Sequence, residues 1–135
     1  MPNVRDTSLK KYGISSHRFL ELYHHCLQYN EWKEELKYKR DTVHSADVSR
    51  GFVRCDNSDA TQSLAMRREE LSRRCELIEQ VAREADADLY QYILKAVTNE
   101  NITYNYLQMN HNIPCGKDMY YDRRKRFYWL LSQRI

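Results

Sequence analysis

Residues 59–85, DATQSLAMRREELSRRCELIEQVAREA, carry the most regular pattern of the chain. Apolar or small side chains recur there at seven-residue spacing and at the alternate positions: Leu64, Leu71, Cys75, Ile78, Ala82 and Ala85. Acidic residues also stand four positions before basic ones, which is the favourable order for ion pairs on a helix, at Glu69, Glu70 and Glu79. The stretch therefore predicts a long amphipathic helix with a narrow apolar seam, capped by Asn57, Ser58 or Asp59.

The composition of the whole chain also favours helices. Of 135 residues, three are Gly and two are Pro, about 4% against an average of roughly 12%. Because strand-rich folds need turn residues about every ten positions, a sandwich or barrel is excluded. No apolar run approaches the roughly 20 residues of a membrane span, and the first residues show no charged-then-apolar signal segment. We expect an all-α protein that does not enter a membrane.

The helical patterns divide the chain into three predicted regions. Residues 1–14 read as a flexible N-terminal arm, residues 15–85 as a helical hairpin with a loop at 44–57, and residues 86–135 as a separate helical region. The first helix of the hairpin is expected to begin after Ser15 or Ser16 and to reach about Thr42, with Asn30 as a break. Two amphipathic helices joined by a loop most simply pack antiparallel.

The seam of the long helix has a second interpretation. Leu64, Leu71 and Ile78 could contact a second copy of the chain or a partner protein instead of the first helix. The sequence leaves both arrangements open.

The third region contains a short helix, a compact break and a longer basic helix. After a helix from Asp86 or Asp88 to Thr98, a second is predicted from its cap at Thr103 to about Asn110. The break contains Asn112, which tolerates a left-handed backbone, and Ile113, an apolar plug. The last helix is expected from Cys115 to Gln133. This order is typical of a helix-turn-helix unit that places its last helix in the major groove of DNA.

The positive charge of the chain is concentrated in this region. The net charge is +3, but residues 102–135 contain six basic and two acidic residues, whereas the remaining 101 residues contain 16 basic and 17 acidic ones. We predict that Met119, the stem of Arg123, Phe127, Leu130 and Leu131 face inward. The residues predicted to contact DNA, from basic and tyrosine side chains suited to phosphates and base edges, are Lys117, Asp118, Tyr121, Arg123, Arg124, Lys125 and Tyr128. The bland alternative is that residues 122–126 are only the solvated side of a terminal helix.

The sequence contains few signs of a catalytic site or a metal-binding site. No nucleophile elbow, phosphate loop or paired-carboxylate arrangement is present, so an enzyme is not expected. The four cysteines, Cys26, Cys55, Cys75 and Cys115, form no C-x-x-C pair and read as small buried thiols. His24 and His25 point about 100° apart on a helix and cannot readily share one metal ion. We expect no cofactor and no metal.

The layout resembles the RinA-like phage late-transcription activators and the ArpU-like regulators of Gram-positive phages. The segments that carry the resemblance are Tyr29–Trp32 with Leu36 and Arg40, Asn57–Thr61, Arg74–Glu79 and Ile113–Leu131, the last being similar to region 4 of sigma factors. The sequence departs from the family at Cys115 and Gly116, where a Ser or Thr cap is more usual.

The resemblance implies a phage- or prophage-encoded activator of late genes, located in the bacterial cytoplasm. Such a protein binds duplex DNA near a promoter, as a monomer or homodimer, and recruits or modifies host RNA polymerase. The DNA contacts implied by the resemblance are Lys117, Asp118, Tyr121, Arg124 and Lys125. A different class of function stays open, namely a small phage protein that binds and inhibits or redirects a host nuclease, polymerase or defence system. RNA binding is a weaker alternative, because the aromatic sheet motifs that stack bases are missing.

Overall fold

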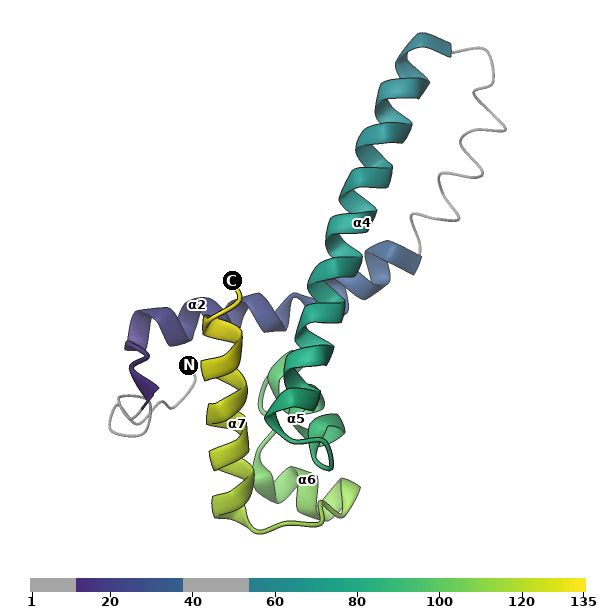
Figure 1. Cartoon of the computed structure of the whole chain (residues 1–135). Coiled ribbons are helices and arrows are strands. Elements are labelled where there is room, and N and C mark those ends of the chain that lie inside the picture. The colour runs from purple at the N-terminus through teal and green to yellow at the C-terminus, as the bar shows by residue number, and fades with distance from the viewer. Residues whose placement is uncertain (1–11, 38–53) are drawn as a thin grey trace. The chain divides into compact units, whose positions relative to one another are not determined.

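The computed structural model describes residues 12–37 and 54–135 of the chain (Figure 1). No strand occurs in these ranges, so the prediction of an all-α fold is confirmed. Besides a helical segment at 29–37, the helices are α2 (Ser16–Leu27), α4 (Arg54–Ala85), α5 (Tyr90–Thr98), α6 (Tyr104–His111) and α7 (Lys117–Ser132). None of the helices in the described ranges is both long and apolar enough to cross a membrane.

The chain divides into two compact units. One consists of Met1–Gln28 together with Leu77–Ile135, and the other of Tyr29–Glu76, so that α4 contributes residues to both. This division differs from the predicted boundaries, because α2 belongs with α5, α6 and α7 and not with a hairpin over residues 15–85. Each unit is described by itself below.

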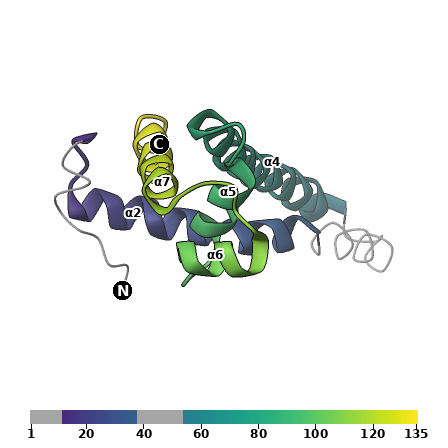
Figure 2. The same cartoon turned by 90° about the horizontal axis from the view of Figure 1, so that it is seen from below.

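The core of the first unit is built from α2, α5 and α7. The helix α2 packs against both α5 and α7, and α5 packs against α7; Figure 2 shows α2 running across α7, which is seen nearly end-on. The edge of one ring meets the face of another where Phe19 of α2 contacts Tyr128 of α7, with ring centroids 4.9 Å apart. Leu22, Ile93 and Leu131 are fully buried in this unit. Burial of each such side chain contributes about 1.5–3 kcal/mol to folding.

In the second unit, the segment at 29–37 lies beside α4. The guanidinium of Arg74 lies 5.4 Å from the ring centroid of Trp32, and Arg67 donates to both carboxylate oxygens of Glu35, at 3.0 and 3.2 Å. Trp32 comes before Glu35 in the sequence, but its partner Arg74 comes after Arg67. The two helical segments therefore run in opposite directions. Trp32 and Leu71 are buried here.

Several predicted helix ends move by a few residues. Ser15 caps α2 as expected, since its hydroxyl accepts a hydrogen bond from the N–H of Arg18 at 3.2 Å. The break after α2 falls at Gln28 and not at Asn30. The helix α4 begins at Arg54, so the predicted caps at Asn57–Asp59 lie inside it and the end of the predicted loop 44–57 is helical. The remainder of that loop lies outside the described residues.

The prediction of a flexible arm is wrong for residues 12–14. Ile14 is buried, and the ring of Tyr12 lies against that of Trp129 with centroids 6.1 Å apart. Between them, Gly13 has a φ of 72°, a left-handed conformation that favours glycine. Residues 1–11 of the predicted arm lie outside the described part of the chain.

Candidate nucleic-acid interface

The connection between α6 and α7 has the local geometry that the sequence predicts. The hydroxyl of Thr103 caps α6 by accepting from the N–H of Tyr106 at 3.2 Å. Asn112 ends the helix in the left-handed region, with φ 50° and ψ 51°, and its N–H bonds to the carbonyl of Leu107. The N–H of Ile113 reaches the same carbonyl at 3.4 Å, so the Leu107 carbonyl accepts from both residues that follow α6. Ile113 itself is buried, as expected of the plug.

A direct hydrogen bond joins α6 to the start of α7. The hydroxyl of Tyr104 donates to the carbonyl oxygen of Cys115 at 2.7 Å. The helix α7 then begins after Gly116, whose position at the N-cap provides no side-chain hydrogen bond. The departure noted at Cys115 and Gly116 therefore leaves the first N–H groups of α7 without a side-chain cap.

The buried face of α7 differs from the predicted one. Tyr120, Phe127, Tyr128 and Leu131 are buried, whereas Met119, which was expected to face inward, is 44% exposed. Because positions 120, 127, 128 and 131 lie on one side of a helix, they form a stripe as regular as the predicted one. The rings of Tyr104 and Phe19 in the neighbouring helices select this stripe by packing on Tyr120 and Tyr128.

This rotation removes two residues from the predicted DNA surface. Tyr128 is only 1% exposed, so the prediction that it faces outward is wrong. Arg124 is half-buried, and its guanidinium lies 5.9 Å from the ring centroid of Tyr128. The positive charge of Arg124 is thus directed toward the tyrosines and not outward from α7.

Two other basic side chains, Arg123 of α7 and Arg134 just after it, are held by acidic residues. Arg123 donates to Asp86 Oδ2 at 3.1 Å and to Asp122 Oδ2 at 3.3 Å. Arg134 forms an ion pair with Glu84, and the hydrogen bond from Arg134 lowers the pKa of that carboxyl. Residues 102–135 have a net charge of +4 by themselves. Glu84 and Asp86 lie outside this range, and their ion pairs with Arg134 and Arg123 reduce the local net charge to +2.

The remaining predicted residues lie on the accessible part of α7. Lys117 and Asp118 are exposed, while Tyr121 and Lys125 are half-buried. Lys117, Tyr121 and Lys125 are four positions apart and share one side of the helix. We refer to these three residues as the lysine–tyrosine stripe.

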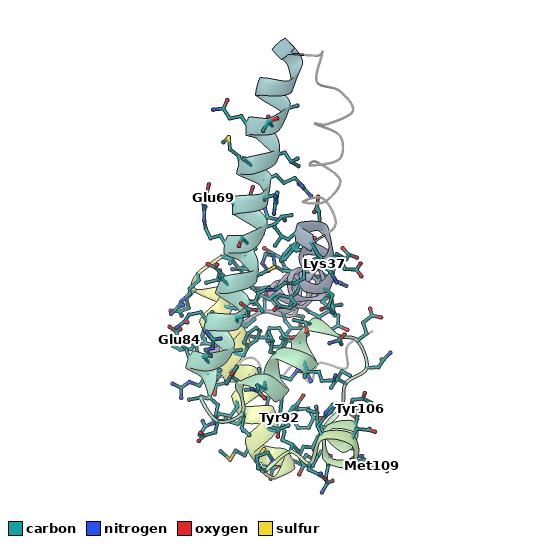
Figure 3. The ribbon with its side chains drawn as sticks, turned by 90° about the vertical axis from the view of Figure 1, so that its right-hand side faces the viewer. Lys37, Glu69, Glu84, Tyr92, Tyr106 and Met109 are labelled. Carbon is teal, nitrogen blue, oxygen red and sulfur yellow. The ribbon has the colours of Figure 1, made fainter. Side chains whose placement is uncertain are left out.

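Further exposed residues of α6 and α7 were not predicted as contacts. Arg126 is exposed at the end of the basic run 122–126. Its positive charge is the sequence signal that could have marked it as a DNA contact. On α6, Tyr106 is 39% and Met109 is 83% exposed, and Figure 3 shows both side chains projecting from that helix. Exposure of large apolar side chains depends on the tertiary fold, so no local pattern identified these two.

The predicted partner seam is occupied by the chain itself over most of its length. Leu71 and Ile78 are buried, and Leu64 is half-buried. Within the folded chain, Leu71 and Ile78 are therefore not available to a second subunit.

The cysteines show the features of ordinary structural thiols. Cys26 and Cys75 are buried and Cys115 is half-buried, and the side chain of Cys55 lies outside the described set. Burial raises the pKa of the Cys26 thiol well above its usual range, which makes the thiolate scarce. In the described part of the chain, no three His, Cys, Asp or Glu side chains are grouped so that they could hold a metal ion.

Comparisons of the chain with protein-family models, with curated proteins and with solved structures gave no match. Its function has therefore to be inferred from its own residues.

Proposed function

We propose that this protein binds duplex DNA through α7 and regulates transcription, as the resemblance to phage late-gene activators implies. The observation that carries the proposal is the joint between α6 and α7. A short helix, a left-handed Asn112 and the buried Ile113 lead into a longer helix, and the Tyr104–Cys115 hydrogen bond fixes the two helices to each other. A recognition helix needs such a brace, because its first turns must be held rigidly in the major groove.

The accessible side chains of α7 suit this role. Lys117 and Lys125 can bind phosphates or the acceptor atoms of guanine, and the hydroxyl of Tyr121 can donate to a phosphate. Asp118, exposed in the first turn, can accept from the amino group of cytosine. The lysine–tyrosine stripe thus combines groups that position a protein on the backbone with groups that read base edges.

The distribution of charge between the units supports the same proposal. Tyr29–Glu76 contains ten basic and ten acidic residues, so the whole net charge of +3 belongs to the unit that contains α7. A local positive excess attracts the phosphate backbone and speeds association.

The proposal is tested by selecting bound duplexes from a random pool at a stated salt concentration. We expect one or a few related sequences to be enriched, and their affinity to fall in the double variant Lys117→Ala, Lys125→Ala. The double variant Lys33→Ala, Lys37→Ala removes the same charge from exposed helical positions of the other unit and serves as the control. Failure to enrich any sequence, with no salt-dependent binding to duplex DNA, would contradict the proposal.

The regulatory step follows from the resemblance and needs its own measurement. We propose that the DNA-bound protein recruits host RNA polymerase, and a homodimer would allow two half-sites to be read. Transcription in vitro from a promoter next to the selected site is expected to increase, and sedimentation gives the oligomeric state. Equal transcript levels with and without the protein would contradict the activating role.

A second candidate function is binding to a host protein. It is favoured by three exposed apolar side chains, Tyr106 and Met109 on α6 and Met119 on α7, because methionines provide adaptable contact surfaces. The double variant Met109→Gln, Met119→Gln separates the candidates. A DNA-binding regulator keeps its duplex affinity in this variant, whereas an inhibitor of a host protein loses its activity while the two lysines remain dispensable.

A further inference from the structure

The carboxylate of Asp86 joins three elements of the first unit. Its Oδ1 accepts from the N–H groups of Asp88 and Leu89, at 2.9 and 3.1 Å, and its Oδ2 accepts from Nε of Arg123 at 3.1 Å. The N–H of Asp86 also continues the last turn of α4, because it donates to the carbonyl of Ala82 at 3.3 Å. The end of α4, the turn before α5 and the middle of α7 therefore meet at one side chain.

Asp86 is the fixed partner of its ion pair. Two backbone N–H groups hold its carboxylate, whereas Arg123 has a long and flexible side chain that adapts to it. The side chains are 12% and 32% exposed, respectively. Partly buried pairs are screened less by salt than surface pairs, and losing one partner leaves an uncompensated charge. The position of Asp86 thus constrains where Arg123 can lie.

Arg123 and the lysine–tyrosine stripe lie on nearly opposite sides of α7. Arg123 is two positions from Tyr121 and two from Lys125, and two positions correspond to about 200° around a helix. As long as Asp86 holds Arg123, the stripe is directed away from the end of α4. The ion pair therefore determines the direction in which the stripe points.

The same ion pair opposes the alternative facing of α7. Met119 and Leu130 share one side of the helix with Arg123, being four and seven positions from it. If α7 were turned so that this side faced the core, the guanidinium would move inward, and burial of an unpaired charge is costly. The pair thus favours the observed facing, in which Met119 stays 44% exposed.

We propose that Asp86 is a positioning residue for DNA recognition, which sets the rotation of α7 about its own axis through Arg123. This inference rests on the proposed function, since it names the residue that aims the lysine–tyrosine stripe at the duplex. Asp86 acts through Arg123 and needs no contact with DNA, because both of its oxygens accept hydrogen bonds within the chain.

The rotation is measured first, without DNA. The chain has four methionines, and a soluble paramagnetic reagent broadens the NMR signals of exposed methionine methyl groups. The variant Asp86→Asn removes the charge but keeps an acceptor for the two N–H groups. In this variant the methyl signal of Met119 is expected to be broadened less, whereas those of Met109 on α6 and Met66 on α4 should be broadened as before.

Recognition is then measured as the ratio of two affinities, for a selected duplex and for a scrambled duplex of the same length. The ratio cancels the sequence-independent gain that follows from losing a negative charge. It also cancels partial unfolding, which lowers both affinities by the same factor. Asp86→Asn is expected to reduce the ratio about tenfold, which corresponds to roughly one base contact.

The matched control is Glu35→Gln. It removes the carboxylate that pairs with Arg67 in the second unit, so that the same charge and one ion pair are lost away from α7. The control should keep both the broadening of Met119 and the affinity ratio of the original chain.

The proposal is overturned if Met119 is broadened equally in Asp86→Asn and in the original chain, or if the affinity ratio is the same in both. A different result contradicts the proposed function alone. If the original chain prefers no duplex, DNA recognition fails, whereas a change at Met119 still identifies Asp86 as the residue that sets the facing of α7.

Discussion

Arg123 donates to Asp86 at 3.1 Å and thereby connects α7 to the first residue after α4. Asp86 also accepts from the backbone N–H groups of Asp88 and Leu89 at 2.9 and 3.1 Å, so the same carboxylate orders the turn before α5. A residue that the sequence assigns to DNA therefore has a structural partner 37 positions away.

We predict that this ion pair stabilises the fold. Because both groups are partly buried, Arg123→Ala should lower the free energy of unfolding by about 1–2 kcal/mol in urea denaturation. In a double-mutant cycle with Asp86→Asn, the coupling energy should reach about 1 kcal/mol. Coupling near zero would show that the contact contributes nothing, and would return Arg123 to the set of side chains available for DNA.

The left-handed Asn112 gives a second prediction. Asn112→Gly should leave stability within about 0.5 kcal/mol, whereas Asn112→Ala should cost about 1 kcal/mol, because a Cβ disfavours the φ of 50°. Asn105→Ala, at an exposed position of α6, is the control for loss of the amide side chain. If Asn112→Ala were as stable as the control in thermal unfolding, the turn would not need the left-handed conformation.

The Tyr12 contact on α7 gives a third prediction. The hydroxyl of Tyr12 donates to Asp122 at 3.4 Å and its ring lies against Trp129. In Tyr12→Ala, Trp129 should become more accessible, which is measured as stronger quenching of its fluorescence by acrylamide. Because the chain has two tryptophans, the variant Trp129→Phe is measured as well, and its remaining fluorescence gives the contribution of Trp32. Unchanged quenching would mean that Tyr12 does not cover Trp129 in solution.

Alkaline pH should unfold the protein through its buried phenols. The folded state raises the pKa of Tyr120 to about 12, and it raises that of Tyr128 further. The stabilisation from the two protonated groups is therefore complete below pH 10, near the unfolded pKa of tyrosine, and is lost as pH rises through the folded values. Absorbance at 295 nm should show two tyrosines ionising together with the loss of helical circular dichroism. Ionisation of all tyrosines before unfolding would contradict this expectation.

Local signals in the sequence were sufficient to predict the connection between α6 and α7. Thr103 as cap, Asn112 as left-handed end and Ile113 as plug each depend on backbone geometry within a few residues, and the structure confirms all three roles. The buried seam from Leu71 to Ala85 was likewise predicted by its spacing.

The facing of α7 could not be predicted in this way. A stripe through Met119 and Leu130 and one through Tyr120 and Tyr128 both satisfy helical periodicity. The choice between them depends on Phe19 and Tyr104, which are distant in sequence and supply the rings that pack on the tyrosines. The partner of Arg123 was equally out of reach, since no local pattern relates it to Asp86. The predicted DNA surface lost Tyr128 and the outward orientation of Arg124 for this reason.

The central claim is that the lysine–tyrosine stripe of α7 binds duplex DNA. The most direct test measures the association constant for a selected duplex at several salt concentrations. Three proteins are compared: the original chain, the double variant Lys117→Ala with Lys125→Ala, and the control double variant Lys33→Ala with Lys37→Ala. If both lysines of the stripe contact phosphates, their removal should reduce the slope of log K against log salt by about 1.8. The control pair should leave the slope unchanged. Equal slopes in all three proteins would contradict the claim.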